Sequence, residues 1–218
     1  MDIAQTIALT MGVAWASGIN LYAAILMLGV MSATGNLALP PDLEILSDPM
    51  VIGAAAFMYF VEFFTDKVPG VDTGWDSIST FIRIPAGAVL AAGAIGDVGP
   101  AAQLAAAIAG GTLTAGTHAT KAGTRVMINT SPEPVSNWFA SVGEDVAVIL
   151  GLWTALAHPV LFIVLLLLFI LFMIWALPKL WRSIKAVFGF LKRKVADTPT
   201  ATDPDKLQSP SSSTKPEP

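Results

Sequence analysis

Long apolar stretches are the feature that most constrains what this chain can fold into. The stretch LFIVLLLLFILFMIW holds no charged residue. Several other apolar stretches are close in length to what a helix needs to cross a bilayer, which is about 20 residues. Charged residues make up 13% of the chain, whereas soluble domains typically carry about 25%. The sequence therefore predicts an all-α, polytopic helix bundle whose main partner is the lipid bilayer, with no nucleic-acid partner.

We expect about six transmembrane helices. They cover roughly Ile3 to Ala33, Met50 to Thr65, Pro85 to Ile95, Ala101 to Thr120, Trp138 to Ala157 and Pro159 to Leu177. The segment Ser17-Gly18-Ile19-Asn20 interrupts the middle of the first helix, so we expect a bend or a break there. The third helix is short for a bilayer of about 30 Å, and we expect it to begin earlier, within SISTFIRI.

The basic residues predict an orientation. All twelve lysines and arginines fall after the second, the fourth or the sixth predicted helix, and therefore on one side of the membrane. Because basic loops stay in the cytoplasm, we expect both termini to be cytoplasmic. The N-terminal segment lacks the basic region of a cleavable signal peptide, so we expect it to be retained as the first span.

Three domains are expected: a transmembrane bundle over 1–178, a basic amphipathic segment over 179–195 and a disordered cytoplasmic tail over 196–218. In PKLWRSIKAVFGFLKRK, basic and bulky apolar residues alternate at helical spacing. The segment from Lys179 to Lys194 fits a helix bound to anionic lipids of the inner leaflet, and equally a basic flank of the last span. The tail is rich in Pro, Ser and charge and cannot bury a core.

Two clusters of ionisable residues stand at the ends of predicted helices. In VEFFTDKVPGVDTGWD, Glu62 and Asp66 lie four residues apart on one helical face, and Asp72 and Asp76 are expected in the turn that follows. The second cluster lies in GTHATKAGTRVMINTSPEP and is mainly basic. Its polar residues are His118, Lys121 and Arg125, on one helical face, and then Asn129.

The two clusters also resemble each other. DTGWDS aligns with NTSPEP, which matches Asp72 with Asn129 and Asp76 with Glu133. Each cluster joins two apolar helices. This pattern is consistent with two parallel helical-hairpin repeats, formed by the second and third and by the fourth and fifth helices.

The clusters are complementary in charge. Ionisable groups near the hydrocarbon region usually pair or face a wet cavity. We therefore predict that Lys121 or Arg125 lies within salt-bridge reach of Glu62, Asp66 or Asp72.

The fifth predicted helix adds two adjacent carboxylates, Glu144 and Asp145, further into the membrane. Adjacent residues of a helix point about 100° apart, so at least one carboxylate should face the bundle interior. Asn20, in the middle of the first helix, is the expected polar partner.

Two functions remain open. A small secondary transporter or permease for an ion or a small charged solute would use these residues as its binding site. A scaffold or lipid-interacting protein would use them as structural ties. A polar cavity from Asp66 toward Asn20, Glu144 and Asp145 favours the transporter, and a dry interior with every charge paired favours the scaffold.

Catalysis is the weakest interpretation, and no catalytic residue or cofactor is expected. His118 with Thr117 or Thr120 is a poor nucleophile–base pair, and Cys is absent. No zinc motif occurs, and the sequence therefore does not identify a set of metal ligands. Small-residue stretches such as AAQLAAAIAGG permit close helix packing, in a compact bundle, a carrier or a homo-oligomer.

Three segments carry a resemblance to a known family: ASGINLYAAILMLGV, EFFTDKVPGVDTGWDSISTFIRIPAGA and HATKAGTRVMINTSPEPVSNW. Over roughly Ile3 to Leu156 the chain resembles the bacterial membrane family labelled domain of unknown function 4126. The resemblance implies an uncharacterised, multi-pass protein of the bacterial inner membrane. EFFTDK is also similar to the E-x-G-D-[KR] motif of a family of membrane cation exchangers. It has one more residue between Glu62 and Asp66 and lacks the Gly.

Overall fold

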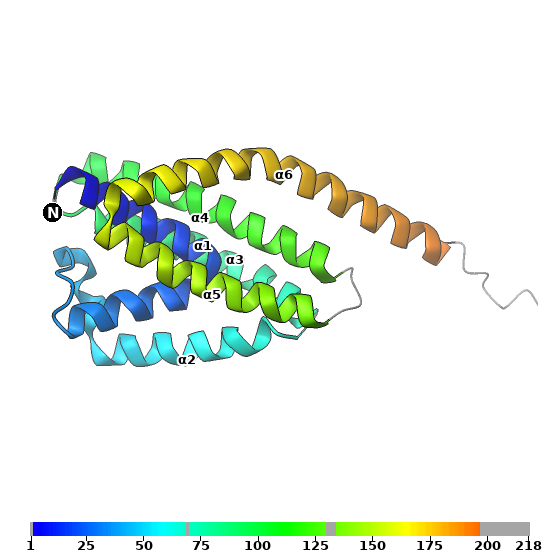
Figure 1. The fold of residues 1–218 in the computed structure, drawn as a ribbon, viewed down its shortest axis with the longest axis horizontal. Coiled ribbons are helices and arrows are strands. Elements are labelled where there is room, and N and C mark those ends of the chain that lie inside the picture. Colours follow the sequence, from blue (N-terminus) through cyan, green and yellow to red (C-terminus); the bar gives the residue numbers. More distant parts are fainter. Residues whose placement is uncertain (1, 69, 130–133, 197–218) are drawn as a thin grey trace, which may run out of the picture. The chain divides into compact units, whose positions relative to one another are not determined.

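A computed structural model describes residues 2–68, 70–129 and 134–196, and this part of the chain is helical without any strand (Figure 1). The elements in chain order are α1 (Ile3–Ala33), the short 3-10 helix η1 (Pro41–Ser47), α2 (Pro49–Thr65), α3 (Val71–Ala94), α4 (Pro100–Asn129), α5 (Pro134–Ala157) and α6 (Pro159–Ala196). The predicted all-α class is therefore confirmed.

Within the described residues, four helical segments are long and apolar enough to cross a membrane: Ile3–Ala33, Val71–Ala94, Trp138–Ala157 and Pro159–Ala186. A fifth span results if η1 and α2, which meet at an angle of 68°, count as one broken span. Helix α4 has the length but is rich in Ala, Gly and Thr. The helices are thus compatible with a membrane protein. Four or five of them are clear candidates for spans, whereas the sequence predicts about six.

The chain divides into two compact units, Met1–Ile184 and Lys185–Pro218, and α6 crosses the boundary between them. The fold and the site described below belong to the first unit. The predicted disordered tail falls almost entirely on 197–218, outside the described residues. Lipid binding by the basic segment remains a prediction.

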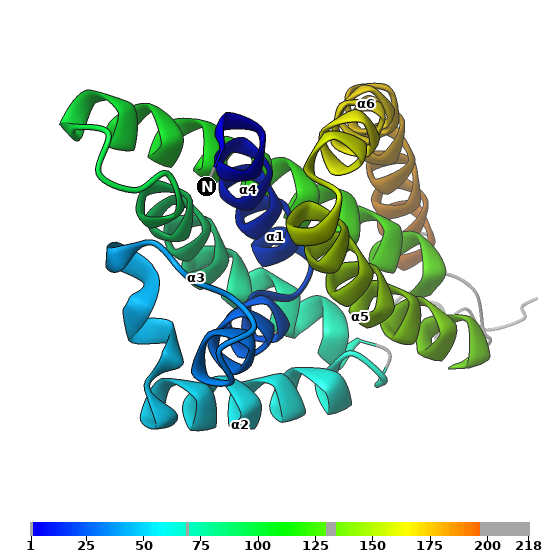
Figure 2. The ribbon, with the colours of Figure 1, turned by 60° about the vertical axis from the view of Figure 1, so that its left-hand side comes forward.

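Helix α1 is broken at Asn20, where φ is −146° and ψ is 98°, as predicted from the sequence. The helix lies among the others and packs against α2, α3, α4 and α5 (Figure 2). Its buried face is apolar, with Leu9, Val13 and Leu28 almost fully enclosed. The break therefore lies inside the bundle.

Helix α3 begins at Val71, so the predicted start before Pro85 is confirmed, and the helix begins earlier still than SISTFIRI. Gly70 has φ +87°, a conformation that side chains rarely tolerate, and it turns the chain directly from α2 into α3. Asp72 and Asp76 therefore lie in the first turns of α3, and the prediction that they lie in a turn before it is wrong. Helical spacing places them on one face with Arg83.

Two other helices run further than predicted. Helix α4 continues past Thr120 to Asn129, so Lys121 and Arg125 lie within it. These two residues and Arg83 are buried in helices, so counting them as loop charges was wrong. The predicted orientation then depends on Lys67 and the basic residues after Leu177.

Helix α6 continues through Pro178 instead of ending at Leu177. A proline removes one backbone donor but keeps its carbonyl, and here Arg182 Nε donates to the Pro178 carbonyl at 3.2 Å. The first part of the predicted amphipathic segment is thus a direct extension of the sixth helix.

Candidate functional site

The N-terminal half of α3 lies beside the C-terminal half of α4, and each presents a polar, buried face to the other. On α3 this face comprises Asp72, Asp76, Ser79 and Arg83, and on α4 it comprises Thr114, Thr117, His118, Lys121 and Arg125. The residues recur at three- and four-residue intervals, so they share one side of each helix. Both predicted clusters are thereby brought together.

Lys121 lies at the centre of the site and is 6% exposed. Its Nζ lies 2.9 Å from Asp66 Oδ2 and 3.4 Å from Glu62 Oε1. It also lies 3.4 Å from Glu144 Oε2 and 3.8 Å from Asp76 Oδ1. The predicted pairing of α4 with the carboxylates around the end of α2 is therefore confirmed.

Arg125 binds Glu144 through two parallel contacts. Its Nε donates to Oε1 at 3.1 Å and its Nη2 donates to Oε2 at 2.6 Å. Its Nη1 donates to the backbone carbonyl of Asp66 at 2.9 Å, and Nη2 lies 3.6 Å from the Asp66 carboxylate. Such a fork fixes the planes of both partners as well as their separation.

Arg83 is the member of the site that sequence reasoning missed, because it was assigned to a loop. Its side chain is fully buried, pairs with Glu62 and lies 4.0 Å from Asp76 Oδ1. The available signal was its spacing: Arg83 follows Asp76 by seven residues, two helical turns along the same face.

The break in α1 contributes backbone groups to the site. Residues before a break lose the partners of their carbonyls, which must then be satisfied elsewhere. Arg83 Nη1 donates to the carbonyl of Ile19 at 2.7 Å and to that of Gly18 at 3.4 Å, and Lys121 Nζ donates to that of Ile19 at 3.0 Å. Two cations thus face the carbonyl end of the first half of α1, which is the negative end of its dipole.

Asn20 begins the second half of α1. Its Oδ1 accepts a hydrogen bond from the Ala23 amide at 2.9 Å, as an N-cap does. Its Nδ2 donates to Asp145 Oδ1 at 3.0 Å. The structure therefore confirms the expected contact between Asn20 and the carboxylates of α5.

Among the described residues, seven charged side chains are joined by ion pairs of 4.0 Å or less, and we call them the ion-pair network. Its members are Glu62, Asp66, Asp76 and Glu144, which are acidic, and Arg83, Lys121 and Arg125, which are basic. Asp72 and Asp145 lie beside the network and are held by amides. Four carboxylates therefore meet three cations.

Asn129 is the partner of Asp72. Its Nδ2 lies 2.9 Å from each carboxylate oxygen of Asp72 and 3.0 Å from Thr73 Oγ1. Glu133, which the alignment of the two clusters matches with Asp76, lies outside the described residues. The repeat itself remains a prediction.

His118 contacts Thr80 rather than the neighbouring hydroxyls considered from the sequence. Its Nε2 lies 2.7 Å from Thr80 Oγ1 and 3.1 Å from the backbone carbonyl of Asp76. Its Nδ1 lies 3.5 Å from Arg83 Nη1. The ring thus links α4 to α3 at the edge of the network.

Two pockets reach the ion-pair network from opposite sides of α4. One, of about 270 Å³, lies among α3, α4 and α6 and is lined by Asp76 together with the hydroxyls of Thr73, Ser77 and Thr80. The other, of about 310 Å³, is lined by Lys121, Glu144 and residues of α1, α4, α5 and α6. Neither matches the cavity described from the sequence, which was to join Asp66, Asn20, Glu144 and Asp145.

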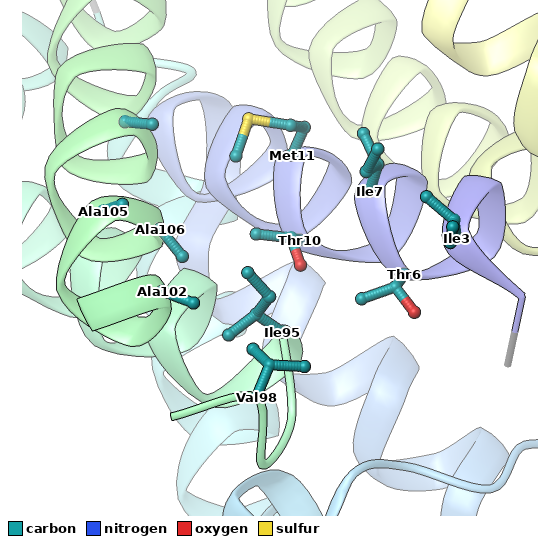
Figure 3. Close-up of a pocket in the computed structure, with 11 residues that line it drawn as sticks. Ile3, Thr6, Ile7, Thr10, Met11, Ile95, Val98, Ala102, Ala105 and Ala106 are labelled. Carbon is teal, nitrogen blue, oxygen red and sulfur yellow. The ribbon is translucent and has the colours of Figure 1, made fainter. Parts of the chain in front are cut away.

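A third pocket, of about 630 Å³, contains none of the predicted site residues (Figure 3). It lies between the start of α1 and the start of α4, and its walls are almost entirely apolar. They include Ile3, Ile7 and Met11 of α1 and Ala102, Ala105 and Ala106 of α4.

Several buried polar atoms of the described site lack a hydrogen-bond partner. They are both carboxylate oxygens of Asp76, Glu62 Oε2, Asp66 Oδ1, Asp145 Oδ2, Asn129 Oδ1, Arg83 Nε and Thr117 Oγ1. Buried polar atoms are usually paired, so these mark positions where a further group can bind. Within the described residues, no three His, Asp or Glu side chains are placed to share a metal ion.

The fold and the site together define an all-helical bundle with a buried ion-pair network at a broken helix, compatible with a membrane protein. The chain belongs to the family of the domain of unknown function DUF4126, whose model matches residues 7–179. This confirms the resemblance seen in the sequence. The comparison with curated proteins found no match, and neither did the comparison with solved structures.

Proposed function

We propose that this protein is a small secondary transporter or permease for an ion or a small charged solute, located in the bacterial inner membrane with both termini in the cytoplasm. The binding site is the ion-pair network together with the break in α1. Helix breaks at the depth of the membrane occur where irregular backbone lines a binding site, because the freed backbone groups need partners.

The observation that carries this proposal is the contact of Arg83 and Lys121 with the carbonyls freed at Asn20. These cations bind both the backbone of the broken helix and the carboxylates of α2. A change in the charge of the network therefore acts directly on the two halves of α1, and this is the coupling that a carrier needs.

The scaffold alternative also has an observation in its favour, since every member of the ion-pair network has at least one oppositely charged neighbour. A purely structural network, however, gains nothing from leaving buried carboxylate oxygens without hydrogen bonds, because each such atom costs about 1–3 kcal/mol. The unpartnered oxygens of Asp76 and Glu62 therefore support the transporter.

Flux measurements in liposomes test the proposal. Purified full-length protein should give a flux that depends on pH or on a cation, and Glu62→Gln or Asp66→Asn should reduce it at least tenfold. Asp42→Asn is the matched control because Asp42 is exposed and outside the network. Unchanged flux in folded Glu62→Gln and Asp66→Asn protein contradicts the assigned site.

A further inference from the structure

Asp72 and Asp76 lie one turn apart on the same face of α3, and both are buried, yet their surroundings differ. Asp72 accepts hydrogen bonds from the amides of Gly70 and Thr73 and from the side chain of Asn129. Neither oxygen of Asp76 has a hydrogen-bond partner, although its side chain is 2% exposed. Asp76 is thus the least satisfied carboxylate of the network.

The charge balance of the network points to the same residue. Four carboxylates against three cations leave one negative charge uncompensated. Lys67, a further cation, donates to the Phe63 carbonyl and to Ser141 and makes no ion pair of 4.0 Å or less within the described residues. For a buried carboxylate without a compensating cation, taking up a proton costs less free energy than remaining charged.

Asp76 is also the carboxylate with the weakest ion pairs. Its Oδ1 lies 3.8 Å from Lys121 Nζ and 4.0 Å from Arg83 Nη2, while Glu62, Asp66 and Glu144 each lie at 3.4 Å or less from a cation. Protonation of Asp76 therefore loses less Coulomb attraction than protonation of any other carboxylate of the network.

The charged and titratable groups around Asp76 come from α2, α3, α4 and α5 and from the residue that follows α2. These are Glu62 of α2, Asp66 after it, Asp72 and Arg83 of α3, His118, Lys121 and Arg125 of α4, and Glu144 of α5. The pocket wall formed by α6 consists of Leu177, Leu180, Trp181 and Ile184, and none of these titrates. A doubly protonated His118 would place a positive charge 3.5 Å from Arg83, so the neutral ring is the form that fits.

We propose that Asp76 is a proton-binding site, loaded through the pocket among α3, α4 and α6. This deepens the proposed function, on which it rests, by naming the proton as the coupling ion. The pocket, at about 270 Å³, has room for several waters of about 30 Å³ each. A hydronium ion in the pocket transfers its proton to an Asp76 oxygen: one O–H bond of the hydronium breaks, one O–H bond forms on Asp76, a water molecule is left, and the net charge of the network becomes zero.

Infrared spectroscopy of the full-length protein in lipid tests the site without any transport. At neutral pH we expect the carbonyl band of a protonated carboxyl group, which disappears at alkaline pH. The band should be lost in Asp76→Asn and kept in Asp72→Asn, the matched buried control. A band that persists in Asp76→Asn overturns the proposal.

The wild-type protein provides an independent arm if a variant does not fold. Aspartate labelled with a heavy carbon isotope at its side-chain carboxyl should shift the band, and an unshifted band overturns the proposal by assigning the proton to a glutamate. Added Na⁺, K⁺, Mg²⁺ or Ca²⁺ at fixed pH should leave the band unchanged. If one of these ions removes the band, the site binds that cation, and the proposal of a proton-binding site is overturned.

The route of the proton to Asp76, through the pocket among α3, α4 and α6, is tested by exchange into deuterated water. Ala122→Phe, which fills the pocket beside Asp76, should slow deuteration of the band at least tenfold, and Ala140→Phe, in the pocket on the other side of α4, should not. The reverse result overturns the path. If proton-dependent flux persists in Asp76→Asn, Asp76 is not the proton-binding site, but the protein is still a transporter. If the Asp76 band is present and no flux is measured, Asp76 binds a proton, but the protein is not a transporter.

Discussion

The two ends of the α3–α4 pair are built from different kinds of contact. In the C-terminal half of α3 and the N-terminal half of α4, small residues allow close approach, as where Gly110 faces Ala91 and Gly87 faces Thr114. In the other halves of the same helices, Arg83 and Lys121 meet the carboxylates of α2. Within the part of the chain that the structure describes, the first region contains no ion pair, and the second concentrates charged side chains.

The energetics of the two regions differ accordingly. Close packing of small residues gains dispersion energy and removes no charge from its solvent. Burying charges costs several kcal/mol per ion, and replacing a buried ion pair by apolar residues of similar volume is often neutral or stabilising. The small-residue end shows that these helices can pack without charge, so the ion-pair network is better explained by function than by stability.

Among the substitutions considered, the removal of Arg83 should destabilise the protein most. Arg83→Met leaves Glu62 without its closest partner and removes one of the two cations that donate to the Ile19 carbonyl, so we expect a loss of about 3–5 kcal/mol in the free energy of unfolding. Denaturant unfolding in detergent micelles measures it. Arg182→Met is the control, because Arg182 is exposed on α6.

Adding Glu62→Gln to Arg83→Met should recover part of that loss, because the double variant buries one uncompensated carboxylate fewer than Arg83→Met. A loss below about 1 kcal/mol in Arg83→Met would mean that the buried pair carries little of the stability of this end.

Removing Asp66 should have a smaller effect. Lys121 keeps Glu62 and Glu144 as neighbours when Asp66 is replaced, so Asp66→Ala should cost about 1–3 kcal/mol. Asp42→Ala should stay within about 0.5 kcal/mol, because Asp42 is exposed and accepts one hydrogen bond, from Gln103 at 3.1 Å. Thermal unfolding of the two variants side by side checks the order, and equal losses would contradict a special role for buried carboxylates.

The sequence predicts much of the fold but only part of the site. Apolar runs are local signals, and they predict most of the helices, while the interruption at Ser17-Gly18-Ile19-Asn20 predicts the break. Complementary charges predict that Lys121 meets Asp66, because neither is stable alone in a low dielectric. The burial of Arg83 is not a local property: it requires Glu62, 21 residues away, and Ile19, 64 residues away.

The start of α3 was missed for a related reason. Polar residues between Val71 and Arg83 are typical of a loop until α4 is known to cover them. Their spacing is helical, but only the packing of α3 on α4 shows that the polar face is an interior one. Charge-based rules for orientation assume solvated basic residues, so they fail for buried ones such as Arg83.

The small-residue end allows the finest comparison, between two glycines in helices. A Cβ at Gly110 would overlap the Cβ of Ala91, whereas a Cβ at Gly53 in α2 would have no other atom within 4 Å. Overpacking costs about 1–3 kcal/mol, and alanine regains up to about 1 kcal/mol over glycine through its helix propensity. Gly110→Ala should therefore lose about 1–2 kcal/mol, while Gly53→Ala should be neutral or gain up to about 1 kcal/mol.

Unfolding in detergent measures both variants, and a stabilised Gly110→Ala would show that α3 and α4 have room to separate. In that case the close contact of the small residues would not be what fixes the distance between these helices. The ion-pair network would then have to hold the pair together, and its charges would be structural after all.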